Sequence, residues 1–190
     1  MAGSDRLILC EGLPDTLSAR AAGLKETGAC GLYGTGGWQT TWLPLFRRAG
    51  RVYVALDRDA TDRAIALART FGTRGRVLIP PEGLGPKGDL NDWLRMGAKG
   101  DPALCRSMLE QALATSPTPW ALQIQRLPSD LAPWDLQDHA GVRDLLCEIG
   151  HQGSISRDAH LRLLAERYGV ALATLQEAAR DFAQSVDAEP

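Results

Sequence analysis

Residues 52–62 read Val-Tyr-Val-Ala-Leu-Asp-Arg-Asp-Ala-Thr-Asp, and this stretch decides the fold of the chain. The apolar run from Val52 to Leu56 predicts a buried strand that ends abruptly at two carboxylates, Asp57 and Asp59. A helical pattern follows at once in residues 63–71. A strand, an acidic turn and a helix in this order place ligand-binding groups at the carboxyl edge of an open α/β sheet.

The pair Asp57 and Asp59 has two interpretations. Residues at an i, i+2 spacing point the same way while a strand continues, and two carboxylates together suit a hard cation such as Mg²⁺. A solvated turn also carries such pairs, because aspartate favours turns. Taken alone, the pair is more typical of a turn than of a metal site.

The flanking sequence repeats the alternation of strand and helix. Helical patterns occupy residues 13–22, 63–71 and about 101–114, and residues 38–48 are expected to be helical as well. Short apolar runs predict three further strands, at residues 6–10, 29–33 and 75–79. We therefore expect an α/β fold with a mostly parallel four-stranded sheet flanked by helices.

The C-terminal part of the chain differs in kind. Prolines interrupt residues 116–136, which predicts a linker, with Trp120 and Trp134 as anchors. Helical patterns follow at 138–149, 157–168 and 171–186, and Leu161, Leu163, Leu164 and Tyr168 form most of an apolar stripe. The predicted organisation is an α/β domain at 5–115, a linker at 116–136 and a small helical unit at 137–186.

The composition limits the class of protein. A hydrophobic content of 44% and a charged content of 23% are ordinary for a globular chain of 190 residues. No apolar run approaches the roughly 20 residues of a membrane helix, and we expect no signal peptide. We expect a cytoplasmic protein without a membrane partner. The four cysteines are scattered, with no histidine at ligand spacing, so no zinc is expected.

The charge is distributed unevenly along the chain. Residues 1–100 hold 14 Lys and Arg against 10 Asp and Glu, whereas the remainder holds 7 against 13. Nucleic-acid contact by the first half is compatible with this balance, but the excess is small for an autonomous DNA-binding protein.

A glycine cluster, Gly34-Thr-Gly-Gly37, precedes the segment 38–48. Glycine turns at helix starts bind phosphate, and they also simply permit a tight turn; the sequence leaves both readings open. Trp38 and Trp42 could stack on bases, although an i, i+4 pair on a helix is more often core packing.

Three acidic motifs occur in order at the predicted strand ends: Glu11-Gly-Leu-Pro-Asp15-Thr-Leu, Asp57-Arg-Asp59-Ala and Lys87-Gly-Asp89-Leu-Asn-Asp92. Together they resemble the TOPRIM domain shared by topoisomerases and primases, in the form found in bacterial and phage primases. The resemblance covers residues 6–96 and includes the glycine-rich turn at residues 32–35. Residues 143–182 resemble, more weakly, the helical segment that follows TOPRIM in bacterial primases.

The resemblance assigns roles to single residues. It implies that Glu11 is a general acid or base or orders a metal, that Asp15 supports it, and that Asp57 and Asp59 bind Mg²⁺ or Mn²⁺. Asp89 and Asp92 would hold a second metal or order the site. The candidate nucleotide- or nucleic-acid-binding residues are Arg58, Arg63, Lys87, Gly34 and Gly36, although each of the three cations is equally well explained as a solvated surface charge.

The function implied is that of a DNA primase: metal-dependent nucleotidyl transfer that makes RNA primers from nucleoside triphosphates on single-stranded DNA during replication. Because the net charge of residues 1–100 is only +4, a replicative helicase or a separate basic primase domain is the expected partner. Two alternatives stay open. One is a TOPRIM nuclease that cleaves phosphodiesters, and the other is a non-catalytic TOPRIM scaffold in a replication complex.

Overall fold

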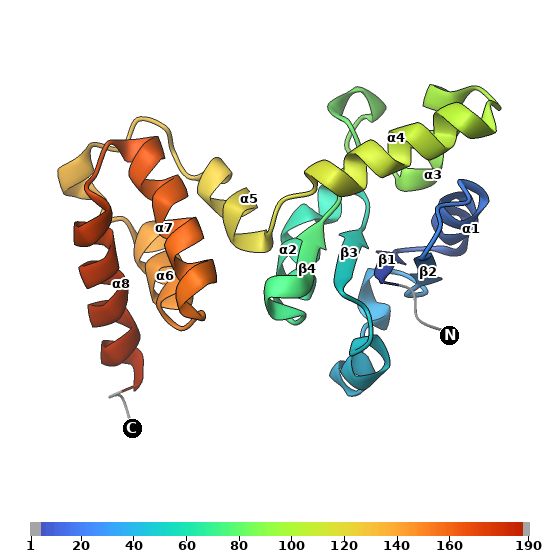
Figure 1. Cartoon of the computed structure of the whole chain (residues 1–190). Helices are drawn as coiled ribbons and strands as arrows, with labels where there is room; N and C mark the ends of the chain where they lie inside the picture. Colours follow the sequence, from blue (N-terminus) through green and yellow to red (C-terminus); the bar gives the residue numbers. More distant parts are fainter. Residues whose placement is uncertain (1–4, 188–190) are drawn as a thin grey trace. The chain divides into compact units, whose positions relative to one another are not determined.

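A computed structural model describes residues 5–187, and the chain forms two compact units, Met1–Pro119 and Trp120–Pro190. Figure 1 shows strands and helices in the first unit and helices in the second. Each unit has a hydrophobic core built from its own side chains. The first unit carries all of the predicted site residues.

The first unit contains a four-stranded parallel sheet in the order β2-β1-β3-β4, which confirms the predicted fold class. Cys10 on the central strand is paired with Gly31 on one side and with Ala55 on the other, so three strands end at one level. The strands are β1 (Arg6–Cys10), β2 (Thr27–Gly31), β3 (Arg51–Ala55) and β4 (Gly75–Val77).

Helices cover both faces of this sheet. The connections from β1 to β2 and from β3 to β4 run outwards in opposite directions, so right-handed crossovers place α1 and α2 on opposite faces. Ile8 and Tyr53 share the face that packs on α1, α3 and α4, and α2 contacts β3 and β4. The helices are α1 (Leu13–Ala21), α2 (Thr61–Arg69), α3 (Leu90–Ala98) and α4 (Pro102–Thr115).

The helix expected at residues 38–48 is replaced by a 3-10 segment, η2 (Thr40–Phe46), and a shorter one, η1 (Thr35–Gly37), precedes it. Pro44 lies inside η2, where it cannot donate the backbone hydrogen bond that an α-helix needs. Trp38 makes edge-on ring contacts with Trp42, Phe46 and Phe71, with centroids 5.4–6.0 Å apart. The two tryptophans therefore pack within the protein, which was the second of the two readings.

The linker predicted at residues 116–136 contains helix α5 (Pro119–Arg126) and a 3-10 turn, η6 (Pro133–Asp135). Trp120, Ile124 and Leu136 are buried in the core of the second unit, so most of this stretch belongs to it. The prediction failed because Pro119 stands at the first position of α5, where a helix tolerates proline. Trp134, expected as an anchor, is 79% exposed.

The second unit packs α6 (Ala140–Gly150), α7 (Ser154–Tyr168) and α8 (Leu172–Asp187) together with α5. Leu161, Leu164 and Tyr168 are buried as predicted, but Leu163 lies outside the core, because residues two apart on a helix face different sides. The Tyr168 hydroxyl donates to the carbonyl of Pro128 at 2.7 Å, which ties α7 to the segment after α5.

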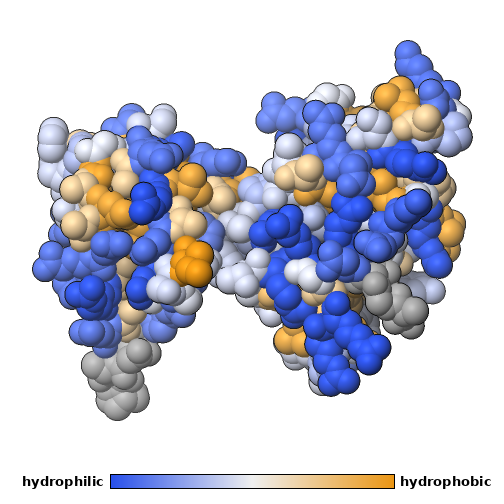
Figure 2. All heavy atoms as spheres, viewed as in Figure 1, coloured by the Kyte–Doolittle hydropathy of each residue, from blue (hydrophilic) through white to orange (hydrophobic). Residues whose placement is uncertain are grey.

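Residues 5–187 contain no helix that is long and apolar enough to cross a bilayer. On the face drawn in Figure 2, hydrophilic side chains separate the hydrophobic patches from one another.

Candidate active site

The carboxyl edge of the sheet brings the first two acidic motifs into contact. Because Cys10 and Ala55 are partners in the sheet, Glu11 and Asp57 leave neighbouring strands at nearly the same level. The backbone N–H of Asp57 donates to Oε2 of Glu11 at 3.4 Å. Both side chains are partly exposed, so a ligand can reach them.

Asp59 lies in the 3-10 turn η3 (Arg58–Ala60) and is exposed. Two backbone hydrogen bonds hold this turn against the loop before α3: the Asp59 N–H donates to the carbonyl of Pro86 at 2.9 Å, and the Arg58 N–H donates to that of Gly88 at 3.3 Å. The second acidic motif is thereby fixed to the third.

Asp15 is the buried acid of the group, with 4% of its surface exposed. Its Oδ2 accepts the N–H of Gly12 at 3.3 Å, and its Oδ1 accepts the N–H of Asn91 at 3.0 Å. Burial raises the pKa of the Asp15 carboxyl, the negative charges of Asp89 and Glu11 raise it further, and the two N–H donors oppose the rise. With both oxygens engaged, Asp15 joins the starts of α1 and α3.

The acids of the third motif occupy the start of α3. Asp89 is the N-cap of this helix, and its Oδ1 accepts the N–H of Asp92 at 2.6 Å. Asp92 pairs with Arg95 at 3.2 Å on the surface. Asp89 therefore combines a capping role with a negative charge close to the site, whereas Asp92 is drawn towards an arginine of its own helix.

Asp57 is the point on which the negative charges converge. Burial raises the pKa of Asp57 to about 6, with further contributions from the charges of Glu11, Asp15, Asp89 and Asp59, in that order. Four of the predicted acids thus lie close enough to disfavour an ionised Asp57. Asp92 is not among them.

These acids fit a partly hydrated cation better than a closed metal cage. Within residues 5–187, no three His, Cys, Asp or Glu side chains converge closely enough to enclose a metal ion. Mg²⁺ commonly binds through one or two carboxylates together with water and substrate phosphates. The oxygen donors of Asp57, Glu11 and Asp59 suit that mode, and Asp15 has no uncommitted oxygen to offer.

The three candidate cations differ in their surroundings. Nη1 of Arg58 donates to the carbonyl of Pro80 at 2.6 Å, and its Nη2 lies 3.7 Å from Glu82, so this side chain holds the loop after β4. Lys87 is exposed. Nη2 of Arg63 lies 3.9 Å from the position that a Cβ at Gly36 would occupy, which places this guanidinium beside the glycine turn.

The glycine turn is built for close backbone approach. A Cβ at Gly37 would lie 1.8 Å from the carbonyl oxygen of Leu32, and Gly34 has a φ of 91°. The N–H of Gly34 donates to the carbonyl of Glu11 at 3.0 Å, so it is not free to bind phosphate. The tight-turn reading therefore accounts for Gly34, and Gly36, which is exposed, stays a candidate for phosphate contact.

Asn91 and Ser18 support the site, and neither had a predicted role. The N–H of Asn91 donates to Asp15, and its side-chain oxygen accepts the Ser18 hydroxyl at 2.8 Å. The role of Asn91 could have been inferred from its place in the third motif, because N–H groups at a helix start have no partner within the helix.

The fold and the site together define an α/β domain in which carboxylates gather at one edge of a parallel sheet. The chain belongs to the Toprim domain family, whose model matches residues 6–100. The predicted resemblance is confirmed at the level of the family. A comparison with curated proteins gave no significant match.

Solved structures of bacterial primases share the fold. The DnaG catalytic core matches with a TM-score of 0.60 and 19% identity, over 92% of this chain and 55% of that one. The RNA polymerase domain of Mycobacterium tuberculosis primase DnaG, in complex with a double-stranded DNA oligomer with a 6-nucleotide overhang, matches with a TM-score of 0.58 and 22% identity, over 88% and 52%. The chain therefore spans about half the length of the primase structures that it matches.

Proposed function

We propose that the chain is a nucleotidyltransferase of the primase type, which joins nucleoside triphosphates into short RNA on a single-stranded DNA template. The observation that carries the proposal is the convergence of four carboxylates on Asp57 at the carboxyl edge of the sheet. Like charges so close together cost stability, and a ligand of opposite charge removes the cost.

A divalent cation at this edge would neutralise charge on the phosphate oxygens and orient the attacking hydroxyl. Asp57, Glu11 and Asp59 would supply its protein ligands. Glu11 would also take up the proton of the attacking hydroxyl, and its Oε2 accepts only a long hydrogen bond, 3.4 Å, from the Asp57 N–H. Asp15 is a positioning residue, because its contacts are to backbone groups of the site and of α3.

The proposal includes a partner that binds the template. Arg58 is committed to the loop after β4, which leaves Arg63 and Lys87 as the phosphate contacts near the acids. Affinity for nucleic acid depends on several such contacts. A separate basic domain or a replicative helicase would provide the rest.

The first test is calorimetric titration of Mg²⁺ or Mn²⁺ into the wild type and into the double variant Asp57→Asn, Asp59→Asn. The proposal requires binding in the wild type that the double variant loses. Asp144→Asn is the matched control, because Asp144 is an exposed carboxylate on α6 of the other unit.

The second test separates the enzyme classes. The chain is incubated with Mg²⁺, nucleoside triphosphates and single-stranded DNA, with and without a basic primase domain supplied in trans. Short RNA that disappears with Asp57→Asn supports primer synthesis. Cleavage of DNA or RNA without added nucleotides would instead show a nuclease, and metal binding without either activity would favour a scaffold.

A further inference from the structure

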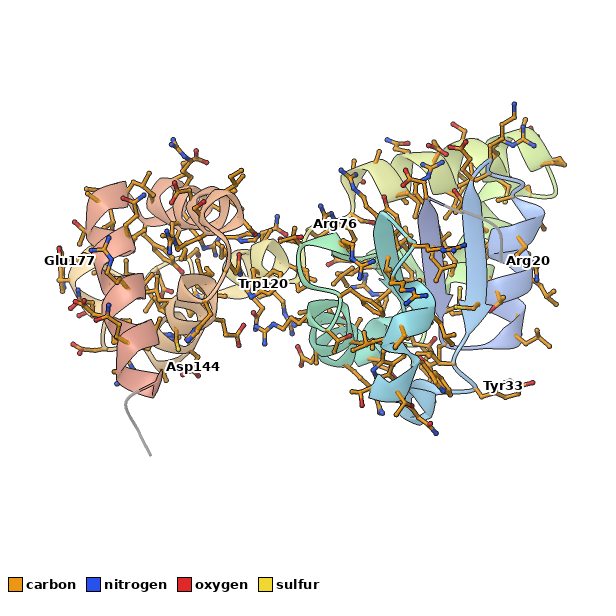
Figure 3. The ribbon with its side chains drawn as sticks, turned by 60° about the horizontal axis from the view of Figure 1, so that its bottom comes forward. Arg20, Tyr33, Arg76, Trp120, Asp144 and Glu177 are labelled. Carbon is orange, nitrogen blue, oxygen red and sulfur yellow. The ribbon has the colours of Figure 1, made fainter. Side chains whose placement is uncertain are left out.

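Tyr33 is an aromatic side chain that the fold leaves in solvent. It is 99% exposed, whereas every other described aromatic side chain of residues 5–119 is buried or partly buried. Figure 3 shows the ring extending away from the ribbon. Burial of apolar surface cannot explain an aromatic residue at this position.

The backbone of Tyr33 also argues against a structural role. Its φ is 58°, in the left-handed region that glycine and asparagine adopt most easily. Hydrogen bonds from the residues before and after Tyr33 hold the turn. The Leu32 N–H donates to the carbonyl of Cys10, and the Gly34 N–H donates to the carbonyl of Glu11, both at 3.0 Å. The ring is thus presented by a fixed but strained turn, an arrangement that concentrates at functional sites.

The position of the ring connects it to the acidic edge. The residue after Tyr33 is hydrogen-bonded to the backbone of Glu11, and the Arg63 guanidinium lies beside Gly36, three residues further on. The turn that presents the ring is therefore hydrogen-bonded to the backbone of the first acidic motif and also lies beside a guanidinium. An aromatic ring suits a base, a guanidinium suits a phosphate, and carboxylates suit a metal.

We propose that the Tyr33 ring is a stacking surface for a nucleobase at the acidic edge, an inference that rests on the proposed function. A nucleobase suits it better than a protein partner, because the turn that carries the ring is bonded to the first acidic motif and lies beside the Arg63 guanidinium, the groups that a nucleotide would need. Stacking accepts every base, because each has a π-face. The base belongs either to the single strand or to the incoming nucleotide.

The test is photocrosslinking of the whole chain with Mg²⁺ and a single-stranded oligodeoxynucleotide that contains 5-iodouracil, with the adduct located by mass spectrometry. A parallel reaction uses 5-iodo-UTP and distinguishes the two sources of the base. We expect the adduct on Tyr33 in at least one of the two reactions.

Binding of whichever ligand gives the adduct, measured by fluorescence anisotropy with a labelled oligonucleotide or a fluorescent UTP analogue, provides the second readout. Tyr33→Asn should weaken it by about five-fold or more, and Tyr33→Trp should retain it. Asparagine is chosen because it tolerates the left-handed backbone. Trp134→Asn is the matched control, since Trp134 is a 79% exposed aromatic residue in the other unit.

The inference is overturned by an adduct elsewhere, by no binding or adduct in the wild type, or by equal losses in Tyr33→Asn and Trp134→Asn. The experiments distinguish a failure of this inference from a failure of the proposed function. Metal binding or primer synthesis that needs Asp57 but not Tyr33 would remove only the stacking site. An adduct on Tyr33 without nucleotidyl transfer would retain the stacking site and remove the proposed activity.

Discussion

The N–H of Asp57 donates to the carboxylate of Glu11, at 3.4 Å, where β3 and β1 end side by side. This contact joins two motifs that are 46 residues apart in the chain. It also places two negative charges next to each other, and Asp15, Asp59 and Asp89 add to them. The site is therefore under electrostatic strain when no cation is bound, which has measurable consequences.

Without metal, the strain makes stability depend on pH. The pKa of Asp57 is raised from 3.8 to about 6, so between these values the folded state binds more protons than the unfolded state. The contribution of Asp57 to stability is therefore fully present below about pH 4 and is lost as the pH rises through 6. A rise of two units corresponds to at most about 3 kcal/mol, and screening at this partly exposed group leaves about 1 kcal/mol.

Asp57→Asn should consequently be more stable than the wild type by about 1 kcal/mol at pH 7.5 in EDTA, and equal to it at pH 4. Unfolding in urea, followed by hydrogen exchange of peptides from β1 and β3, reports on this unit alone. Asp144→Asn should follow the wild type at both pH values. An Asp57→Asn variant with the pH slope of the wild type would contradict the electrostatic account.

Binding of Mg²⁺ should offset the repulsion among the carboxylates around Asp57 and so stabilise the folded state. A ligand that binds only the folded state stabilises it by RT ln(1 + [L]/Kd), or about 1.4 kcal/mol at ten times Kd. The gain should appear as a raised melting temperature of the first unit, and the double variant Asp57→Asn, Asp59→Asn should show no rise. An equal rise in both proteins would mean that the cation binds elsewhere.

Mutation of Asp15 should lower the stability of the fold, whereas mutation of Asp59 should mainly weaken metal binding. Asp15→Ala leaves the N–H groups of Gly12 and Asn91 without their acceptor inside the protein and should cost about 2 kcal/mol of stability. Asp59→Ala removes an exposed carboxylate and should change stability by less than about 0.5 kcal/mol, while it weakens Mg²⁺ binding. Urea unfolding and calorimetry of the two variants check both halves. A stable Asp15→Ala would show that this acid does not join α1 to α3.

The glycine turn offers a matched pair of substitutions. Alanine at position 37 would place its Cβ 1.8 Å from the Leu32 carbonyl oxygen, so Gly37→Ala must displace backbone and should cost at least about 2 kcal/mol. Gly36→Ala meets only the end of the Arg63 side chain, at 3.9 Å, and should be nearly neutral. Comparable unfolding free energies for the two variants would contradict the tight turn.

The sequence predicts those parts of the fold that follow from periodicity and from the ends of strands. Glu11 and Asp57 could be placed together because neighbouring parallel strands end at one edge. Helix α5 could not be predicted from proline content, since Pro119 starts the helix and does not break it. Pro44 was a local signal against an α-helix at residues 38–48. The bond from Asn91 to Asp15, by contrast, depends on a tertiary contact that no local pattern encodes.

Tyr33 is the residue for which stability and the inferred function should oppose each other. A left-handed backbone costs a residue with a Cβ roughly 1–2 kcal/mol, and glycine avoids this cost. Because the ring has almost no contacts to lose, Tyr33→Gly should stabilise the first unit by about 1 kcal/mol, less the entropy that glycine gives the unfolded chain. The same variant should lose the base-stacking contribution to oligonucleotide binding. Urea unfolding and anisotropy on one preparation test both effects, with Tyr33→Asn as the control that keeps a side chain. A Tyr33→Gly variant destabilised by more than about 1 kcal/mol would show that the ring has a structural role after all, because glycine's entropy in the unfolded chain accounts for no more than that.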